Sequence, residues 1–240
     1  MNRPSAHKNV CIIGNSHAAC IKMAWDRIGK EYPEITLSFF AARGDHLAAL
    51  AVQGRTLVAT TDLARQMLQH TSGGRDHIDF EPYDHCLICA AGFSYPYHLQ
   101  AARHYSKAVQ LQCLQDLFRG SLLYRLAKDI RQITAIPVWL EHAPLLALAE
   151  RKEQEFCFSY MDFLHQLRQM LPGADIHFLP QVAETVAEGC FTHPRFSAGS
   201  RRLDIGDEIS GELHPPEDRA HMNEKFGEAL LNDFFRRIGY

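Results

Sequence analysis

The sequence lacks several features that define whole classes of protein. No apolar run approaches the roughly 20 residues that a helix needs to cross a bilayer, and the polar stretch before Gly14 does not form the apolar core of a secretory signal. Basic residues are not in excess, because 25 Lys and Arg stand against 28 Asp and Glu, for a formal net charge of -3. A chain without a basic field holds a nucleic-acid backbone poorly. We therefore expect a cytoplasmic protein with no membrane span and no nucleic-acid partner.

Motifs for disulfides, metals and nucleotides are missing as well. The 7 cysteines are odd in number and mostly lie among apolar residues, which is typical of reduced thiols. Cys86 and Cys89 have CxxC spacing, but they fall in a strand-like run where side chains alternate between faces. The 14 histidines include no pair with zinc-ligand spacing. Gly14 has no companion glycines to hold a pyrophosphate, so we expect neither a cofactor nor a metal.

The composition that remains is that of an ordinary globular chain. Over 240 residues, 46% are hydrophobic and 22% are charged, which excludes extensive disorder. This length suits one α/β domain, and we predict a single domain over residues 1–240. Glycines and prolines are concentrated at about 188–216, where we expect an irregular loop insertion. The oligomeric state cannot be predicted from these features.

Apolar runs alternate with segments of helical spacing. Runs typical of buried parallel strands lie at 10–13, 35–40, 86–90, 137–140 and 175–179. Helical spacing is found around 21–28, at about 104–134 and 146–171, and from 221 onward. This alternation predicts an α/β fold, in which helices cover both faces of a central, mostly parallel five-stranded sheet to make a three-layer α/β/α sandwich. In such a sheet a ligand binds at the carboxyl ends of the strands.

The first candidate motif is Gly14-Asn15-Ser16-His17, which follows the first predicted strand. Glycine permits a tight turn, and Ser16 then lies beside the start of a helix. Free backbone N–H groups and the helix dipole stabilise negative charge there, so the position suits a nucleophile. A simple helix cap by Asn15 or Ser16 is the structural alternative.

The second candidate motif contains Asp218 and His221, near the start of the last predicted helix. An imidazole can deprotonate a serine, and a carboxylate three residues away can orient that imidazole. Helix capping by Asp218 and a surface position for His221 are the alternatives. The combination of both motifs, one after the first strand and one after the last, favours a catalytic arrangement.

These two motifs resemble the first and last blocks of the SGNH hydrolases, also called GDSL-type esterases and lipases. The resemblance implies a flavodoxin-like fold with Ser16 as nucleophile, His221 as general base and Asp218 as the residue that orients it. It also implies an oxyanion hole formed by Ser16 and Gly44, with Ser94 as the third donor. Here the sequence departs from the family, which has Asn in place of Ser94 and Asp in place of Asn15. The shorter Ser94 side chain puts full activity in question.

Other polar residues follow the predicted strands and are candidate substrate contacts. They are His17 beside the nucleophile, His46 after the second strand, Gly92 after the third and His142 after the fourth. For His46 and His142, a polar residue at a strand end without a ligand is the alternative.

Three functions are consistent with this pattern. The leading hypothesis is a serine-dependent hydrolase that cleaves a short-acyl ester of a carbohydrate or small molecule through an acyl-enzyme. An O-acyltransferase that acts on a sugar or polysaccharide would use the same nucleophile. A catalytically weak module that binds a glycan or small ligand is the third, and Ser94 and Asn15 favour it.

Overall fold

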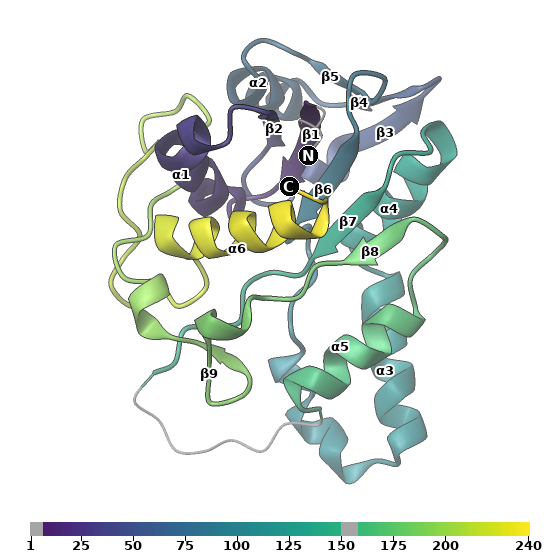
Figure 1. The fold of residues 1–240 in the computed structure, drawn as a ribbon. Helices are drawn as coiled ribbons and strands as arrows, with labels where there is room; N and C mark the ends of the chain where they lie inside the picture. The colour runs from purple at the N-terminus through teal and green to yellow at the C-terminus, as the bar shows by residue number, and fades with distance from the viewer. Residues whose placement is uncertain (1–6, 150–157) are drawn as a thin grey trace, which may run out of the picture.

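The computed structural model describes residues 7–149 and 158–240, and it is built on a central parallel sheet (Figure 1). Its strands are β1 (Lys8–Gly14), β2 (Ile35–Ala41), β6 (His85–Cys89), β7 (Val138–Glu141) and β8 (Ile176–Phe178). They lie in the order β2-β1-β6-β7-β8, and every neighbouring pair is parallel. The predicted five-stranded sheet is confirmed, with small differences at the strand ends. Because β1 has β2 on one side and β6 on the other, its carboxyl end is the point where the strand order reverses.

Helices cover both faces of this sheet, which confirms the three-layer arrangement. The first face is covered by α1 (Ala18–Ile28) and α6 (Glu224–Arg237), and the second by α2 (Asp62–Ser72), α3 (Lys107–Arg119), α4 (Leu122–Ile133) and α5 (Tyr160–Gln169). Alternate residues of each strand enter opposite clusters: Ile12 packs with the first group of helices and Ile13 with the second. Cys86 and Cys89 of β6 likewise belong to opposite clusters, and the cysteines among the described residues are free thiols.

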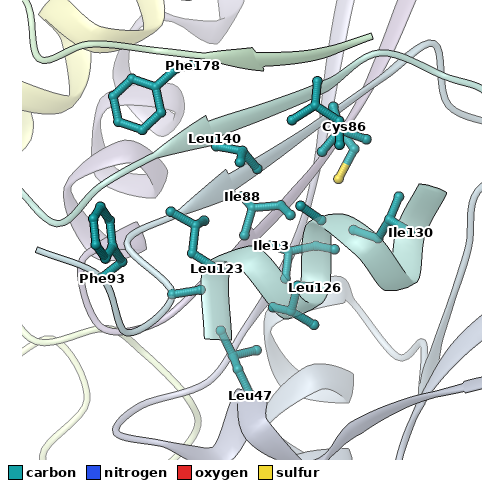
Figure 2. Packing of buried hydrophobic residues seen from close by; sticks show 14 of the residues in the cluster. Ile13, Leu47, Cys86, Ile88, Phe93, Leu123, Leu126, Ile130, Leu140 and Phe178 are labelled. Atoms are coloured by element: carbon teal, nitrogen blue, oxygen red, sulfur yellow. The ribbon is translucent and has the colours of Figure 1, made fainter. Parts of the chain in front are cut away.

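The packing on the second face is seen from close by in Figure 2. Leu123, Leu126 and Ile130 of α4 lie against Ile13 and Ile88 of the sheet, and all of these side chains are fully buried. They recur at helical spacing on one side of α4, so the amphipathic sequence alone accounts for the contact. Burying one such side chain contributes about 1.5–3 kcal/mol to folding.

Helices α1 and α6 approach each other closely on the first face. A Cβ atom added to Gly227 would lie 2.1 Å from the carbonyl oxygen of Cys20, so only glycine fits this crossing. The two helices run side by side in Figure 1, where α1 is purple and α6 is yellow. This contact joins the beginning of the chain to its end.

Several predicted elements differ from the structure. The expected helix at about 104–134 is divided into α3 and α4, because the side chain of Ser121 accepts a hydrogen bond from the Tyr124 N–H and starts a new helix. The expected helix at 146–171 is wrong in its first part: residues 146–148 are extended, and Ala147 forms a bridge to Thr192. Residues 150–157 of that prediction lie outside the described residues. Of the helix expected at 146–171, the described residues form only α5.

Smaller elements lie outside the predicted alternation. A separate antiparallel sheet contains β3 (Leu50–Gln53), β4 (Thr56–Ala59) and β5 (His77–Asp79), and β9 (Val186–Ala187) pairs with β10 (Phe191–Thr192). Short 3-10 turns occur at Gly29–Glu31, His46–Ala49, Tyr97–His104, Ala183–Thr185 and Pro194–Phe196. Across the two described ranges, no helix combines the length and the apolar character that a bilayer crossing requires.

Candidate active site

The first part of the site is the turn that joins β1 to α1. Gly14 ends the strand, and a Cβ atom there would lie 2.8 Å from the Cβ of Ala18, which explains the glycine. Asn15 fixes the turn on both sides: its Oδ1 accepts from the His17 N–H at 3.1 Å, and its Nδ2 donates to the Ala90 carbonyl at 2.8 Å. Ser16 is thereby held just before the positive end of α1.

The second part is the stretch before α6, which carries Asp218 and His221. Neither residue is in the helix, because α6 begins at Glu224. Ser16 Oγ lies 2.9 Å from His221 Nε2, and His221 Nδ1 lies 2.8 Å from Asp218 Oδ2. The structure thus joins Ser16 to Asp218 and His221, which lie some two hundred positions later in the sequence, in one hydrogen-bonded chain. With the Nδ1 proton donated to the carboxylate, Nε2 is free to accept the serine proton.

Asp218 is held as an anion. Partial burial disfavours its charge, but the backbone N–H groups of His221 and Ala220 and the His221 ring donate to it, and together they lower its pKa to about 2. Its two carboxylate oxygens therefore have separate roles: Oδ1 accepts the two backbone N–H groups, and Oδ2 faces the imidazole. The carboxylate is therefore ionised at neutral pH, where it can orient His221 without competing for its proton.

Side chains outside helices and strands hold this stretch in place. Asn223 is the N-cap of α6: its Oδ1 accepts from the backbone of Lys225 at 3.1 Å, while its Nδ2 donates to the Arg195 and Ala198 carbonyls at 2.8 and 2.9 Å. The Arg219 side chain donates to the Ala147 carbonyl. The predicted loop at about 188–216 is therefore bonded directly to the residues beside His221.

The three predicted oxyanion donors lie at the same edge of the sheet. Gly14 of β1 is paired with Ala41 of β2 and with Cys89 of β6, so Gly44 and Ser94 follow the two strands that flank Ser16. Gly44 has a φ of +60°, and both Gly44 and Ser94 are exposed. The backbone N–H groups of Ser16 and Gly44 and the hydroxyl of Ser94 make no hydrogen bond to another described residue. These donors are free for a ligand.

The predicted substrate contacts are placed very differently from one another. His46 is half-buried in the 3-10 turn after β2, and Gly92 is exposed after β6 with a φ of +68°. His142 is buried in the core: its Nδ1 contacts the Ala143 carbonyl, and its Nε2 lies 2.7 Å from the Tyr160 hydroxyl. Burial lowers the pKa of His142 to about 4. Because both of its ring nitrogens have partners, we leave His142 out of the proposed site.

A residue that was not predicted from the sequence lies directly against His221. His214 stacks on His221 with 3.9 Å between ring centroids and 7° between ring planes, and His17 also stacks on His221 at 4.8 Å. The only available sequence signal was the i, i+4 spacing from His214 to Asp218 in a loop without helical periodicity. Nothing in that pattern indicates a stack.

One cluster has the composition of a metal site. Within the described ranges, His214, Asp218 and His221 offer ligand atoms that all lie within 4.8 Å of one another. Hydrogen bonding explains the cluster without an ion, because His221 Nδ1 faces Asp218 Oδ2 at 2.8 Å. A metal on Nδ1 would displace the proton that this contact holds, and the tautomer needed for a base at Nε2 would be lost. These three side chains therefore suit a hydrogen bond between His221 Nδ1 and Asp218 Oδ2 better than a metal ion.

A second carboxyl group lies buried near Cys89 of β6 and Cys20 of α1. Glu141 ends β7 and is almost fully buried, and burial raises its pKa to about 8 although the Cys89 thiol donates a hydrogen bond to it. Cys20 of α1 lies close enough to feel its charge. Glu141 is therefore protonated at neutral pH and belongs to the packing beneath the site.

Comparison with known proteins gives structural likeness only. No family model and no curated protein matches the chain. A carbohydrate esterase family 2 enzyme plus carbohydrate-binding domain from Corynascus thermopiles (Myceliophthora fergusii) aligns with a TM-score of 0.42 and 13% identity, over 100% of this chain and 69% of that chain. The periplasmic domain of a lipopolysaccharide acetyltransferase from Salmonella ser. Paratyphi A aligns with a TM-score of 0.44 and 12% identity, over 98% and 85%. Neither likeness is close enough to indicate a function.

Proposed function

We propose that this protein is a serine-dependent ester hydrolase that acts on a short-acyl ester of a carbohydrate or small molecule. The observation that carries the proposal is the hydrogen-bonded chain from Ser16 through His221 to Asp218. A serine hydroxyl is a weak nucleophile by itself and needs a base within hydrogen-bond reach, which a third group must orient. Both contacts have the distances that this chemistry requires.

The reaction proceeds in two halves. His221 Nε2 takes the Ser16 proton as Oγ attacks the ester carbonyl, and His221 then gives that proton to the departing alcohol. The acyl group stays on Ser16 as an ester. Water then attacks it with His221 again as base, which releases the acid and restores the serine. Asp218 stabilises the imidazolium that forms in each half.

Negative charge develops on the carbonyl oxygen in both halves of the reaction, and hydrogen-bond donors must stabilise it. The free N–H groups of Ser16 and Gly44 are the proposed donors, with the Ser94 hydroxyl as the third and the positive end of α1 behind them. Losing one such donor costs about 3 kcal/mol in a typical oxyanion hole. His46 and Gly92, at the same sheet edge, are proposed to contact the rest of the substrate.

A fluorophosphonate probe tests the activated serine without knowledge of the substrate. We expect one stoichiometric adduct by intact mass on the wild type and none on Ser16→Ala or His221→Ala. Ser197→Ala is the matched control, because its hydroxyl is bonded to the Pro194 carbonyl and lies outside the chain of hydrogen bonds. An unlabelled but folded wild type, or labelling that survives in Ser16→Ala, would overturn the proposal.

Turnover is then measured with p-nitrophenyl acetate and an acetylated sugar. Both Ser16→Ala and His221→Ala should lose roughly 10⁴-fold or more in kcat, because members of a catalytic chain act as a unit. Supplying a sugar acceptor distinguishes water from alcohol as the second nucleophile. Free acetate as the main product supports a hydrolase, whereas acetylated acceptor as the main product would replace it with a transferase.

A further inference from the structure

Three imidazole rings lie in a stack with the proposed base in the middle. His214 and His17 each stack on His221, and no ring contact joins His214 to His17 in the described structure. The two therefore lie against opposite faces of the His221 ring. A ring held on both faces can turn only within its own plane, and that plane contains the bonds to Ser16 and Asp218.

His214 differs from an ordinary packing residue because it is polar and buried. Its side chain is only 5% exposed, and its Nδ1 lies 3.2 Å from Asp218 Oδ2, the same oxygen that faces His221 Nδ1 at 2.8 Å. Its Nε2 is shielded from solvent and has no hydrogen-bond partner among the described residues. An apolar ring would give the same stack without leaving a buried nitrogen unpaired, and an unpaired buried nitrogen is destabilising.

The charges around the stack keep His214 neutral. Burial and the neighbouring His221 lower the pKa of His214, Arg202 and Arg43 act in the same direction, and Asp218 opposes them. Burial and His221 also lower the pKa of His17 well below its ordinary value. Both outer rings therefore stay uncharged while His221 gains its proton, so the charge that develops on the base meets no like charge on either face.

We propose that His214 is a positioning residue for the base: its ring fixes the plane of His221, and its Nδ1 shares the carboxylate oxygen that orients His221. This inference rests on the proposed function only for its catalytic consequence. The groups that face His221 are Asp218 beside it, His214 from the preceding loop and His17 from the turn before α1; Arg202 and Arg43 lie near His214.

Two variants separate the ring from the shared oxygen. His214→Phe keeps a stacking ring but removes the ring nitrogen that lies 3.2 Å from Asp218 Oδ2, whereas His214→Asn keeps a polar nitrogen near the Nδ1 position but removes the ring. The rate of fluorophosphonate labelling is followed against pH, and the ring protons of His221 are titrated by NMR in the same samples. His177→Asn is the matched control, because His177 is an exposed histidine on β8 whose ring contact is with Trp139, at a tilt of 33°.

The two variants should fail in different ways. In His214→Phe the stacking ring is kept and only the polar contact with Asp218 Oδ2 is lost, so the midpoint of the acid limb of the labelling rate moves by about half a pH unit or more, and the plateau rate changes little. In His214→Asn the midpoint stays in place, while the plateau rate falls about tenfold because the base is less well oriented. The control variant should match the wild type in both readouts.

An unmoved midpoint in His214→Phe would overturn the shared-oxygen role, and an unchanged plateau in His214→Asn would overturn the role of the ring. Equal losses of rate and of melting temperature in both variants, with unmoved midpoints, would reduce His214 to packing. If His214→Phe does not fold, His214→Leu replaces it. The midpoint of the His214→Leu variant must then move as expected for His214→Phe. If the wild type is not labelled at all, the proposed function fails, and the NMR titration still decides the His214 inference.

Discussion

The two arms of the proposed site are built in opposite ways. Ser16 stands on a turn between a buried strand and a helix, so the backbone of regular structure sets its position. His221 stands in a stretch with neither helix nor strand, where hydrogen bonds made by the side chains of Asp218, Asn223 and Arg219 set its position. The first arm depends mainly on local sequence, with one bond from Asn15 to the distant Ala90 carbonyl, whereas the second depends mainly on contacts with distant parts of the chain. We call residues 14–17 the nucleophile arm and residues 214–223 the base arm.

The carboxyl groups near the two arms show the same contrast. Glu141, packed near Cys89 and Cys20 on the nucleophile side, is surrounded by apolar and thiol groups, and burial raises its pKa to about 8. Asp218, in the base arm, has N–H donors on both oxygens, and they lower its pKa to about 2 despite partial burial. Deep burial keeps Glu141 protonated, whereas partial burial and several N–H donors keep Asp218 charged.

Gly227→Ala should have the largest effect on both arms, because it pushes them apart at the crossing of α1 and α6. The new Cβ would lie 2.1 Å from the carbonyl oxygen of Cys20. We expect a loss of about 3 kcal/mol or more in the free energy of unfolding by urea, together with slower fluorophosphonate labelling. The control is Lys225→Ala on the exposed side of the same helix. A stabilised Gly227→Ala variant, as helix propensity alone would predict, would contradict the close crossing.

Asn223→Ala should affect the base arm and leave the nucleophile arm intact. The variant loses the cap of α6 and two hydrogen bonds to the loop carbonyls of Arg195 and Ala198. We expect about 1–2 kcal/mol of destabilisation and about tenfold slower labelling of Ser16. Its control is Ser106→Ala, which removes the cap of α3 far from either arm. That control should lose stability without slower labelling, and equal labelling rates in the two variants would contradict the tethering role.

Glu141→Gln should give an effect on stability that grows with pH. The folded protein holds a proton on Glu141 up to about pH 8, whereas the unfolded chain releases it near the ordinary value of 4.5. Stability is therefore fully present below pH 4.5 and falls as pH rises toward 8, by up to about 1.4 kcal/mol for each unit. Glutamine has no proton to lose, so the variant should become more stable than the wild type above neutral pH.

Thermal unfolding from pH 5 to pH 9 measures this difference. Glu81→Gln is the control, because Glu81 is exposed. Parallel stability curves for the wild type and Glu141→Gln over the whole range would contradict a protonated Glu141.

Much of the fold could be predicted from the sequence because the signals are local. The five buried strands are short apolar runs, and the helices beside them carry apolar residues at helical spacing. The predictions were wrong where a contact decided the outcome. Residues 146–148 have a helix-like composition but are extended, because the N–H of Leu148 donates to Thr192 and the Ala147 N–H to Arg219.

The nucleophile arm and the base arm were found with different completeness. Ser16, Asp218 and His221 were predicted from motif and family resemblance, and the structure joins them in one chain of hydrogen bonds. His214 was missed because ring stacking within a loop produces no periodic pattern in the sequence. His142 was over-interpreted, because a histidine at a strand end has the same local sequence whether it faces a ligand or the core.

The sequence by itself determined the alternation of strands and helices, the glycine turn before Ser16 and the order of the candidate residues along the chain. Those features depend on side-chain size, hydrophobicity and backbone freedom within a few residues. Only the tertiary structure decided that residues 205 positions apart meet at 2.9 Å, that Asp218 is shared by two imidazoles, and that Glu141 keeps its proton. Hydrogen bonding, stacking and the free energy of a buried charge depend on neighbours in space, and the linear sequence does not record them.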